Sequence, residues 1–188
     1  RIGVDDQNPH EVLPEFITKV ANSGCNVFII HARKALLRGL SPKDNRIIPP
    51  LQYPLVYEMQ KNFPGLDIIL NGGLTELKEM KSCVKNRVAG VMIGREAYEN
   101  PSLLLNVDNE IFDQKEKVRS MKDAIRNMIE YCNREKAEGT AIKGILKHLK
   151  GAFKGRANSK EFKRVLFCNE TTDSEKLERL SNLVPIYC

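Results

Sequence analysis

Short apolar runs alternate with segments of helical periodicity through the first half of the chain. Three nearly continuous apolar runs predict strands covered on both faces: residues 26–31, 66–73 and 88–95. Helical patterns lie around them: residues 11–23, 54–62 and 75–84. Thr75 is a favourable cap for the third helix, and the opening residues RIGVD are typical of the end of an earlier strand.

The order of these elements indicates the fold. Strands that alternate with helices predict βα units and a parallel sheet. Each unit is about 25 to 40 residues long and its strand ends in polar or glycine residues, which favours a (β/α)8 barrel over a doubly wound sheet. We therefore predict an α/β fold in which residues 1–105 form the C-terminal half of a (β/α)8 TIM barrel, with about four of its eight units.

The pattern changes after Pro101, where strand-like runs stop and charged sequence with helical periodicity continues to the end. Four helices are predicted there: residues 116–136, 142–154, 159–167 and 174–183. Asn158 and Ser159 precede the third helix, and Asp173 and Ser174 precede the fourth, as residues that favour helix starts. Residues 106–188 are therefore predicted to form a small all-helical domain.

Composition narrows the class of protein. A chain of 188 residues with 41% hydrophobic content can bury a core. A net charge of +6 and a pI of 9.1 suggest a polyanionic partner such as nucleic acid, although excess lysine also serves solubility. No apolar run is long enough to cross a bilayer, so we expect no membrane partner. The chain starts at Arg1 without a methionine, and we expect it to be part of a longer protein.

The five cysteines form no CxxC pair and no ligand cluster with the three histidines. We therefore expect reduced thiols, no structural zinc or other metal site, and a cytoplasmic location, with an organelle left open. Cys25 stands before the first predicted strand, at the end remote from the chemical face of a barrel. We interpret it as structural.

The carboxyl ends of barrel strands meet at one site, which brings together residues that are far apart in sequence. Six residues are predicted to be neighbours there: His31, Asn71, Gly72, Gly73, Gly94 and Arg95. Glycine amides before a helix bind phosphate, and an arginine adds a bidentate clamp. Either glycine motif alone is better explained by a tight turn, but two of them with an arginine favour a phosphate site.

A basic loop follows His31 and carries Arg33, Lys34 and Arg38. Loops of this length in compact domains are usually functional or disordered. The alternative interpretation of His31 is that a lone histidine at the end of an apolar strand is only a hydrogen-bonded core residue. A second basic group lies in the helical domain: Lys143, Lys147, Lys150, Lys154, Arg156, Lys160, Lys163 and Arg164. It fits contacts to an RNA backbone or, alternatively, a solvated helix face.

The stretch FIIHARKALLRGLSPKDNRIIPPLQYPLVYEMQKNFP, followed by NGG and VAGVMIGREAYENP, resembles the FMN-dependent A-type tRNA-dihydrouridine synthases. The resemblance continues weakly through ILKHLKGAFKGRANSKEFKRVL and covers most of the chain. It implies an FMN-binding barrel with a C-terminal helical tRNA-binding domain. The implied reaction reduces the C5–C6 double bond of a D-loop uridine in tRNA. Reduced FMN supplies the hydride, a cysteine supplies the proton, and NADPH is the reductant.

The resemblance also implies roles for individual residues. His31 corresponds to a flavin-contacting histidine, Asn71, Gly72 and Gly73 to the loop beside the flavin phosphate, and Gly94 and Arg95 to the rest of that phosphate site. Arg1 and Arg33 correspond to basic residues on the substrate side of the flavin, and we expect Lys34 and Arg38 to meet the RNA.

The catalytic cysteine of that family belongs to the first half of its barrel, as do a flavin-contacting glutamine and a lysine just before RIG. None of these is in this chain, so we predict no catalytic residue here and no uridine reduction by this chain alone. The alternatives are another FMN-binding barrel that acts on a small molecule and an RNA-binding fragment without chemistry. A homodimer is one way to cover the open edges of a half barrel.

Overall fold

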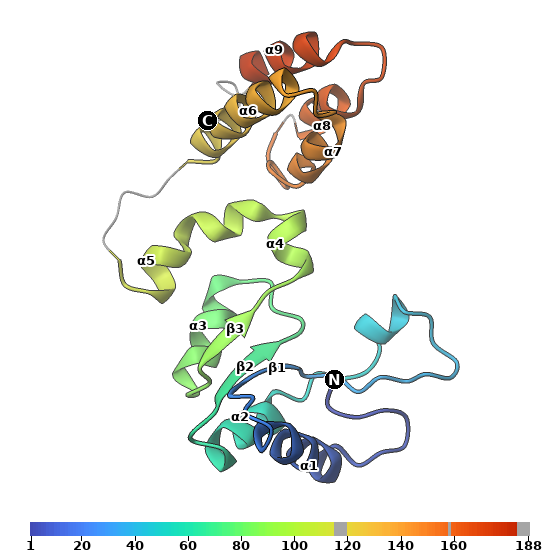
Figure 1. Ribbon diagram of the computed structural model, residues 1–188, viewed down its shortest axis with the longest axis vertical. Helices are drawn as coiled ribbons and strands as arrows, with labels where there is room; N and C mark the ends of the chain where they lie inside the picture. The colour runs from blue at the N-terminus through green and yellow to red at the C-terminus, as the bar shows by residue number, and fades with distance from the viewer. Residues whose placement is uncertain (115–119, 158, 184–188) are drawn as a thin grey trace. The chain divides into compact units, whose positions relative to one another are not determined.

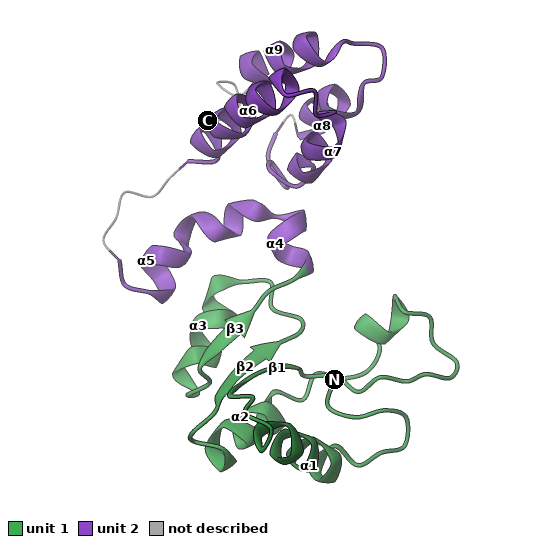
Figure 2. Cartoon of the chain, viewed as in Figure 1, with its two compact units in different colours: residues 1–94 green, residues 95–188 purple. Residues whose placement is uncertain are grey.

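The computed structural model describes residues 1–114, 120–157 and 159–183. The chain forms two compact units, residues 1–94 (unit 1) and residues 95–188 (unit 2), which Figure 2 distinguishes by colour. Among the described residues, no helix is both long and apolar enough to cross a membrane.

Unit 1 is built on a three-stranded parallel sheet in the order β1-β2-β3 (Figure 1). Its strands are β1 Val27–His31, β2 Asp67–Asn71 and β3 Gly90–Met92, and its helices are α1 Pro9–Ala21, α2 Tyr53–Asn62 and α3 Leu77–Lys85. A short 3₁₀ turn, η1 Asp44–Arg46, lies in the loop between β1 and α2. This mixed α/β architecture with a parallel sheet confirms the coarse fold class, while the half barrel stays a prediction.

Helix α1 begins at Pro9, two residues before the predicted start at residue 11. Asn8 accepts a hydrogen bond from the backbone N–H of His10, and Pro9 occupies the first helical position, where its missing N–H costs nothing. Leu13 and Ile17 are buried, four residues apart on one face of the helix. The opening RIGVD is not a full strand: it makes a single parallel bridge, between Val4 and Ala35.

The two faces of the sheet differ. Phe28, Ile30, Ile68 and Leu70 are at most 7% exposed, and α2 packs on β2 while α3 packs on β3. On the opposite face of β1, Val27 is 50% exposed and Ile29 is 55% exposed, because side chains alternate along a strand. The prediction of strands covered on both faces is therefore wrong for the described chain, in which one face of β1 lies open.

Unit 2 is helical throughout the part that the structure describes. Its longer helices are α6 Met121–Ala137, α8 Ser159–Phe167 and α9 Asp173–Leu183, and its shorter segments are α4 Arg95–Glu99, η2 Pro101–Asn106, α5 Val107–Ile111, α7 Lys143–Leu146 and η3 Lys147–Leu149. Helix α6 begins with a reciprocal cap between Ser120 and Asp123. Its apolar stripe joins side chains of the other helices in one buried cluster. The described part of unit 2 is thus helical, while a separate domain of residues 106–188 stays a prediction.

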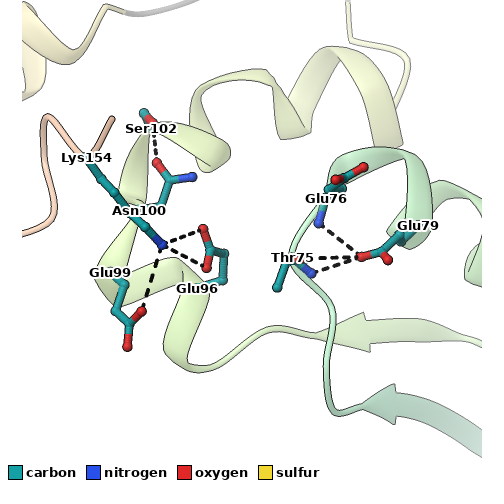
Figure 3. Close-up of polar contacts among 8 residues, drawn as sticks. All are labelled: Thr75, Glu76, Glu79, Glu96, Glu99, Asn100, Ser102 and Lys154. Atoms are coloured by element: carbon teal, nitrogen blue, oxygen red, sulfur yellow. Dashed lines mark hydrogen bonds and ion pairs between the residues drawn. The ribbon is translucent and has the colours of Figure 1, made fainter. Parts of the chain in front are cut away.

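The compact units divide earlier in the chain than the predicted boundary at residues 105 and 106. The reason is α4, which packs with the η3 region of unit 2. The Tyr98 hydroxyl lies 3.1 Å from Nδ1 of His148, and Lys154 pairs with Glu96 at 3.3 Å (Figure 3). Gly151 faces the last carbonyls of α4, where a Cβ atom would lie 2.5 Å from the oxygen of Glu99.

Other element boundaries also differ from the predicted ones. The third strand was predicted to reach residue 95, but β3 ends at Met92 and Arg95 begins α4. The helix predicted for residues 142–154 breaks into α7 and η3, and residues 101–111, for which no element was predicted, form η2 and α5. Residues 116–119 of the first predicted helix and the predicted cap Asn158 lie outside the described residues.

Candidate functional site

The carboxyl ends of the three strands lie in register at one edge of the sheet. His31 pairs with Asn71, and Asn71 pairs with Met92. The Asn71 side-chain amide donates to the Met92 carbonyl at 3.1 Å, and the Ala32 N–H donates to the Asn71 carbonyl at 2.9 Å. The structure therefore brings His31 and Asn71 together, as the sequence predicts. Both lie on the open face of the sheet, the face that also carries the exposed side chain of Ile29.

Gly72 follows β2 in a conformation that L residues rarely adopt, with φ at +114°. A Cβ atom at Gly72 would lie 3.0 Å from Cε1 of His31 and 3.2 Å from a methyl group of Leu51. At Gly73, with φ at +72°, a Cβ atom would lie 2.5 Å from the other Leu51 methyl group. Both glycines are thus required by close approach as well as by backbone conformation.

A tyrosine fixes this turn through its hydroxyl group. The Tyr53 hydroxyl donates to the Gly72 carbonyl at 2.6 Å, and the Gln52 N–H donates to the Ala32 carbonyl at 2.8 Å. Residues at the start of α2 therefore hold the ends of β1 and β2 in place. Sequence reasoning missed Tyr53, because nothing in the local pattern distinguishes it from an ordinary residue in the first turn of a helix.

His31 is half-buried beside positive charges. Burial, followed by the charges of the Arg1 side chain, of the amino group at residue 1 and of Arg33, lowers the pKa of His31 to about 4, so its imidazole is neutral at pH 7. Its Nδ1 atom is buried and has no hydrogen-bond partner among the described residues. A buried polar atom of this kind is rarely left unsatisfied, which indicates a ligand or water position beside His31.

The side chain of Arg33 joins the start of the β1–α2 loop, residues 33–50, to the end of that loop. Its guanidinium donates to the Ile47 carbonyl at 3.0 Å and also to the Pro49 carbonyl. Arg1 acts in the same way and donates to the carbonyls of Lys34 and Asn45 at 3.1 and 3.0 Å. Both residues therefore have a structural role in this loop, and the substrate contacts predicted for them from sequence stay a prediction.

The guanidinium groups in this region are close enough to affect one another. Burial, then the charges of Arg33 and Arg46, lowers the pKa of the Arg1 guanidinium. Arg46 was not among the predicted site residues, and only the folded loop places it near Arg1. Lys34 is half-buried and Arg38 is exposed, and neither side chain has a partner among the described residues. Clustered cations of this kind favour an anionic ligand.

The start of α3 is already capped by carboxylates. Glu79 accepts hydrogen bonds from the backbone N–H groups of Thr75 and Glu76 at 3.1 and 3.2 Å (Figure 3). Glu76 completes a reciprocal capping box, so Thr75 does not act as the predicted cap. Because an anion occupies this helix start, a phosphate beside NGG would contact the Gly72 and Gly73 turn rather than the first turn of α3.

Gly94 and Arg95 span the division between the compact units. Gly94 follows β3 by two residues and has open space around its Cα atom. Arg95 is the first residue of α4 in unit 2, and its exposed guanidinium has no partner among the described residues. Their joint role in binding a phosphate stays a prediction.

The basic residues of unit 2 belong to several short elements, not to one helix face. Most of them are exposed; Lys163 is half-buried, Lys154 is paired with Glu96, and Arg164 is paired with Glu161 at 2.6 Å. Lys143 donates to the Asn169 side chain at 3.3 Å. Lys147, Lys150, Arg156 and Lys160 keep exposed charges without partners among the described residues.

The cysteines of unit 1 lie away from the carboxyl edge of the sheet. Cys25 precedes β1 at its amino end, where the thiol contacts the Val27 carbonyl at 3.4 Å. Cys83 is buried on α3 and accepts a hydrogen bond from the Tyr57 hydroxyl at 3.4 Å. In unit 1 the edge therefore offers a neutral imidazole, glycine amides and cations. This set suits binding of an anionic or hydrogen-bonding ligand.

Comparisons with known proteins place this geometry in context. The family model described as Dihydrouridine synthase (Dus) matches residues 1–185. The tRNA-dihydrouridine(20/20a) synthase of Escherichia coli (strain K12) is 46% identical over 167 residues, which cover 88% of this chain and 48% of that protein. The proteins of the same name from Pasteurella multocida (strain Pm70) and Salmonella typhi are 43% and 42% identical, over 88% and 98% of this chain and 50% and 56% of their own lengths. The chain thus spans about half the length of the curated relatives it matches.

Proposed function

The chain belongs to the dihydrouridine synthase family, and we propose that the full-length protein that contains it is a flavin-dependent oxidoreductase that reduces uridine in the D-loop of tRNA to dihydrouridine. The names of its relatives support this activity. The observation that carries the proposal is the carboxyl edge, where His31, Asn71 and the Gly72 turn meet on one side of a parallel sheet.

The residues of this edge fit FMN. The unpartnered Nδ1 of His31 offers a hydrogen-bonding position, and Gly72 and Gly73 form a turn without Cβ atoms that packs directly against His31 and Leu51. We propose that His31, Asn71, Gly72, Gly73, Gly94 and Arg95 bind FMN, with the glycine amides and Arg95 at its phosphate. FMN, when bound, supplies the hydride that uridine receives, and NADPH is the expected reductant.

The chain's own residues then orient the two partners. A neutral His31 can hold a polar ligand atom without adding positive charge. The charges of Arg1 and Arg33 act on His31, and these two residues are proposed to hydrogen-bond the uracil carbonyls. Lys34 and Arg38 are proposed to contact tRNA phosphates, which fix position without reading sequence. The basic residues of unit 2 are proposed to add further backbone contacts.

Proton donation to uridine is assigned to a residue outside this chain. A hydride added to a uracil ring requires a proton on the neighbouring carbon, and a general acid must lie close to that atom. The cysteines of unit 1 lie away from the carboxyl edge, at the amino end of β1 and on α3. We therefore expect this chain alone, given FMN, NADPH and tRNA, to form no dihydrouridine.

The experiment compares the full-length protein with this chain. Unmodified tRNA is incubated with FMN and NADPH, and dihydrouridine is measured by mass spectrometry of nucleosides. We expect product from the full-length protein only. No product from the full-length protein, together with NADPH oxidation by small uracil compounds, would favour a barrel enzyme of small-molecule chemistry. Product from this chain would contradict the assignment of the general acid.

A further inference from the structure

The β1–α2 loop carries three aliphatic side chains that the described chain leaves in water. Leu37 is 70% exposed, Ile47 is 56% exposed and Ile48 is 59% exposed. Each of these side chains would gain by burial, and three exposed apolar groups in one loop favour an interaction site over scattered surface positions. Figure 1 shows this loop, in light blue, projecting from the sheet beside the end of β1.

The loop is held in a defined conformation by polar side chains of its own and by Asp5. Asn45 accepts a hydrogen bond from the Leu36 N–H at 2.8 Å and donates to the Leu36 carbonyl at 2.6 Å. Asp5 accepts from the Leu37 N–H at 2.7 Å, and Ser41 donates to Asp44 at 2.6 Å. The aliphatic side chains are therefore presented by an ordered backbone, which lowers the entropic cost of binding.

Positive charge surrounds these aliphatic side chains. Between residues 33 and 50 the sequence has five basic residues and one acidic residue. Arg38, Lys43 and Arg46 are exposed, and their side chains have no partner among the described residues. Nucleic acids combine charged phosphates with the apolar faces of their bases. An apolar surface with cations around it therefore suits binding of a nucleic acid.

We propose that Leu37, Ile47 and Ile48 form an apolar wedge that contacts the bases beside the target uridine in tRNA and keeps that uridine out of the base stack. The inference rests on the proposed function and adds a role that the cations do not fill. Aliphatic wedges unstack base steps in other nucleic-acid complexes, and a base that reacts in an enzyme pocket must leave its stack. The wedge lies in the loop that begins at the end of β1, two residues after His31.

The test uses the full-length protein and a tRNA with 2-aminopurine beside the target uridine, because this probe brightens when it loses its stacking partner. The variant Leu37→Ser/Ile47→Ser/Ile48→Ser removes the wedge and keeps all the cations. We expect this variant to lose most of the fluorescence rise. Its single-turnover rate of uridine reduction should fall roughly tenfold, because the base must then unstack without help from the protein. Its FMN affinity and the salt dependence of its tRNA binding should stay as in the wild type.

Two further variants make the result specific. Ile47→Leu/Ile48→Leu keeps an aliphatic surface and should retain the fluorescence rise, whereas Phe16→Ser removes a side chain on α1 that is 58% exposed and should change nothing. An unchanged rise in the triple variant would overturn the wedge. So would a fall in its melting temperature beyond that of Phe16→Ser, because the side chains would then pack within the protein. A wild-type rise that is lost in the triple variant, without any dihydrouridine formed, would contradict the proposed function and support the wedge.

Discussion

The two compact units differ in how completely they bury their apolar side chains. Unit 2 gathers residues from α6, α7, α8 and α9 in one cluster in which every member is at most 8% exposed. Unit 1 buries one face of its sheet and leaves Val27, Ile29 and Met92 between 44% and 55% exposed on the other. The described helices of unit 2 therefore enclose one buried core, whereas the sheet of unit 1 leaves one face open.

The open face of unit 1, and not the buried core of unit 2, carries the candidate site. The candidate site residues His31 and Asn71 lie on the same face as Ile29, because residues two apart along a strand point to the same side. An apolar sheet face of this kind is expected to be covered in the working protein. Unit 1 thus presents one side of the candidate site, where His31 and Asn71 lie on an open sheet face and not in a closed core.

The largest expected effect is a cavity in the core of unit 2. Phe162 is 1% exposed and packs edge-to-face on Phe153 with ring centroids 4.8 Å apart. Phe162→Ala should lower the free energy of unfolding of unit 2 by about 3–5 kcal/mol, measured by hydrogen exchange of its amides. Phe167→Ala on the same helix removes a ring that is 47% exposed and should cost about 0.5 kcal/mol or less. Equal losses for the two variants would mean that the core is not closed.

A smaller effect is expected from a methyl group in the site of unit 1. Gly72→Ala places a Cβ atom 3.0 Å from His31 at a φ of +114° and should weaken FMN binding to the full-length protein by about 1–3 kcal/mol. Gly24→Ala is the matched control, because Gly24 has a φ of +95° and a Cβ atom there would meet no other atom within 4 Å. FMN titration should leave the Gly24→Ala affinity unchanged. A similar loss in both variants would indicate general backbone strain rather than a cofactor contact.

The strands and the edge that they share were predictable because their signals are local. The first two predicted strands, residues 26–31 and 66–73, contain β1 and β2. His31 and Asn71 end these strands, so they lie side by side once the two strands pair in parallel. The break between α7 and η3 was not predictable. It accompanies the packing of Gly151 against the carbonyls of Tyr98 and Glu99, a contact between segments far apart in sequence.

The predicted site shows the same limit. Arg33 was identified from its position after a strand, but its bonds to the Ile47 and Pro49 carbonyls depend on how the whole loop folds. Glu79 likewise replaces Thr75 at the start of α3 because its carboxylate reaches back by one turn. Residue type and spacing predicted that His31, Asn71 and Gly72 meet at the edge, while the place of Gly94 and Arg95 there stays a prediction. They did not predict which of them form hydrogen bonds with the protein's own backbone.

The effect of pH on unit 1 should be smaller again. The pKa of His31 is about 4 in the folded protein and near 6.5 in an unfolded chain, so the neutral form is favoured by folding. The neutral His31 imidazole therefore lowers the free energy of unfolding as the pH drops from 6.5 toward 4, and it has no such effect above pH 6.5. Because His31 is only half-buried, we expect a loss of about 1 kcal/mol relative to His31→Gln between pH 6.5 and 4.5, measured by urea unfolding. Identical pH profiles for the two proteins would contradict the lowered pKa, which NMR titration of His31 can check directly.

The smallest effect is expected where α4 is held to the rest of unit 2 by charge. Lys154 lies 3.3 Å from Glu96 and 3.8 Å from Glu99, but its side chain is 45% exposed. Exposed ion pairs contribute little, so Lys154→Ala should lower the free energy of unfolding by about 0.5 kcal/mol at low salt and by less at 1 M salt. Lys150→Ala, at an exposed lysine without a partner among the described residues, is the control and should have no salt-dependent cost. A cost for Lys154→Ala that persists at high salt would mean that the lysine stem, packed beside α4, contributes more than its charge.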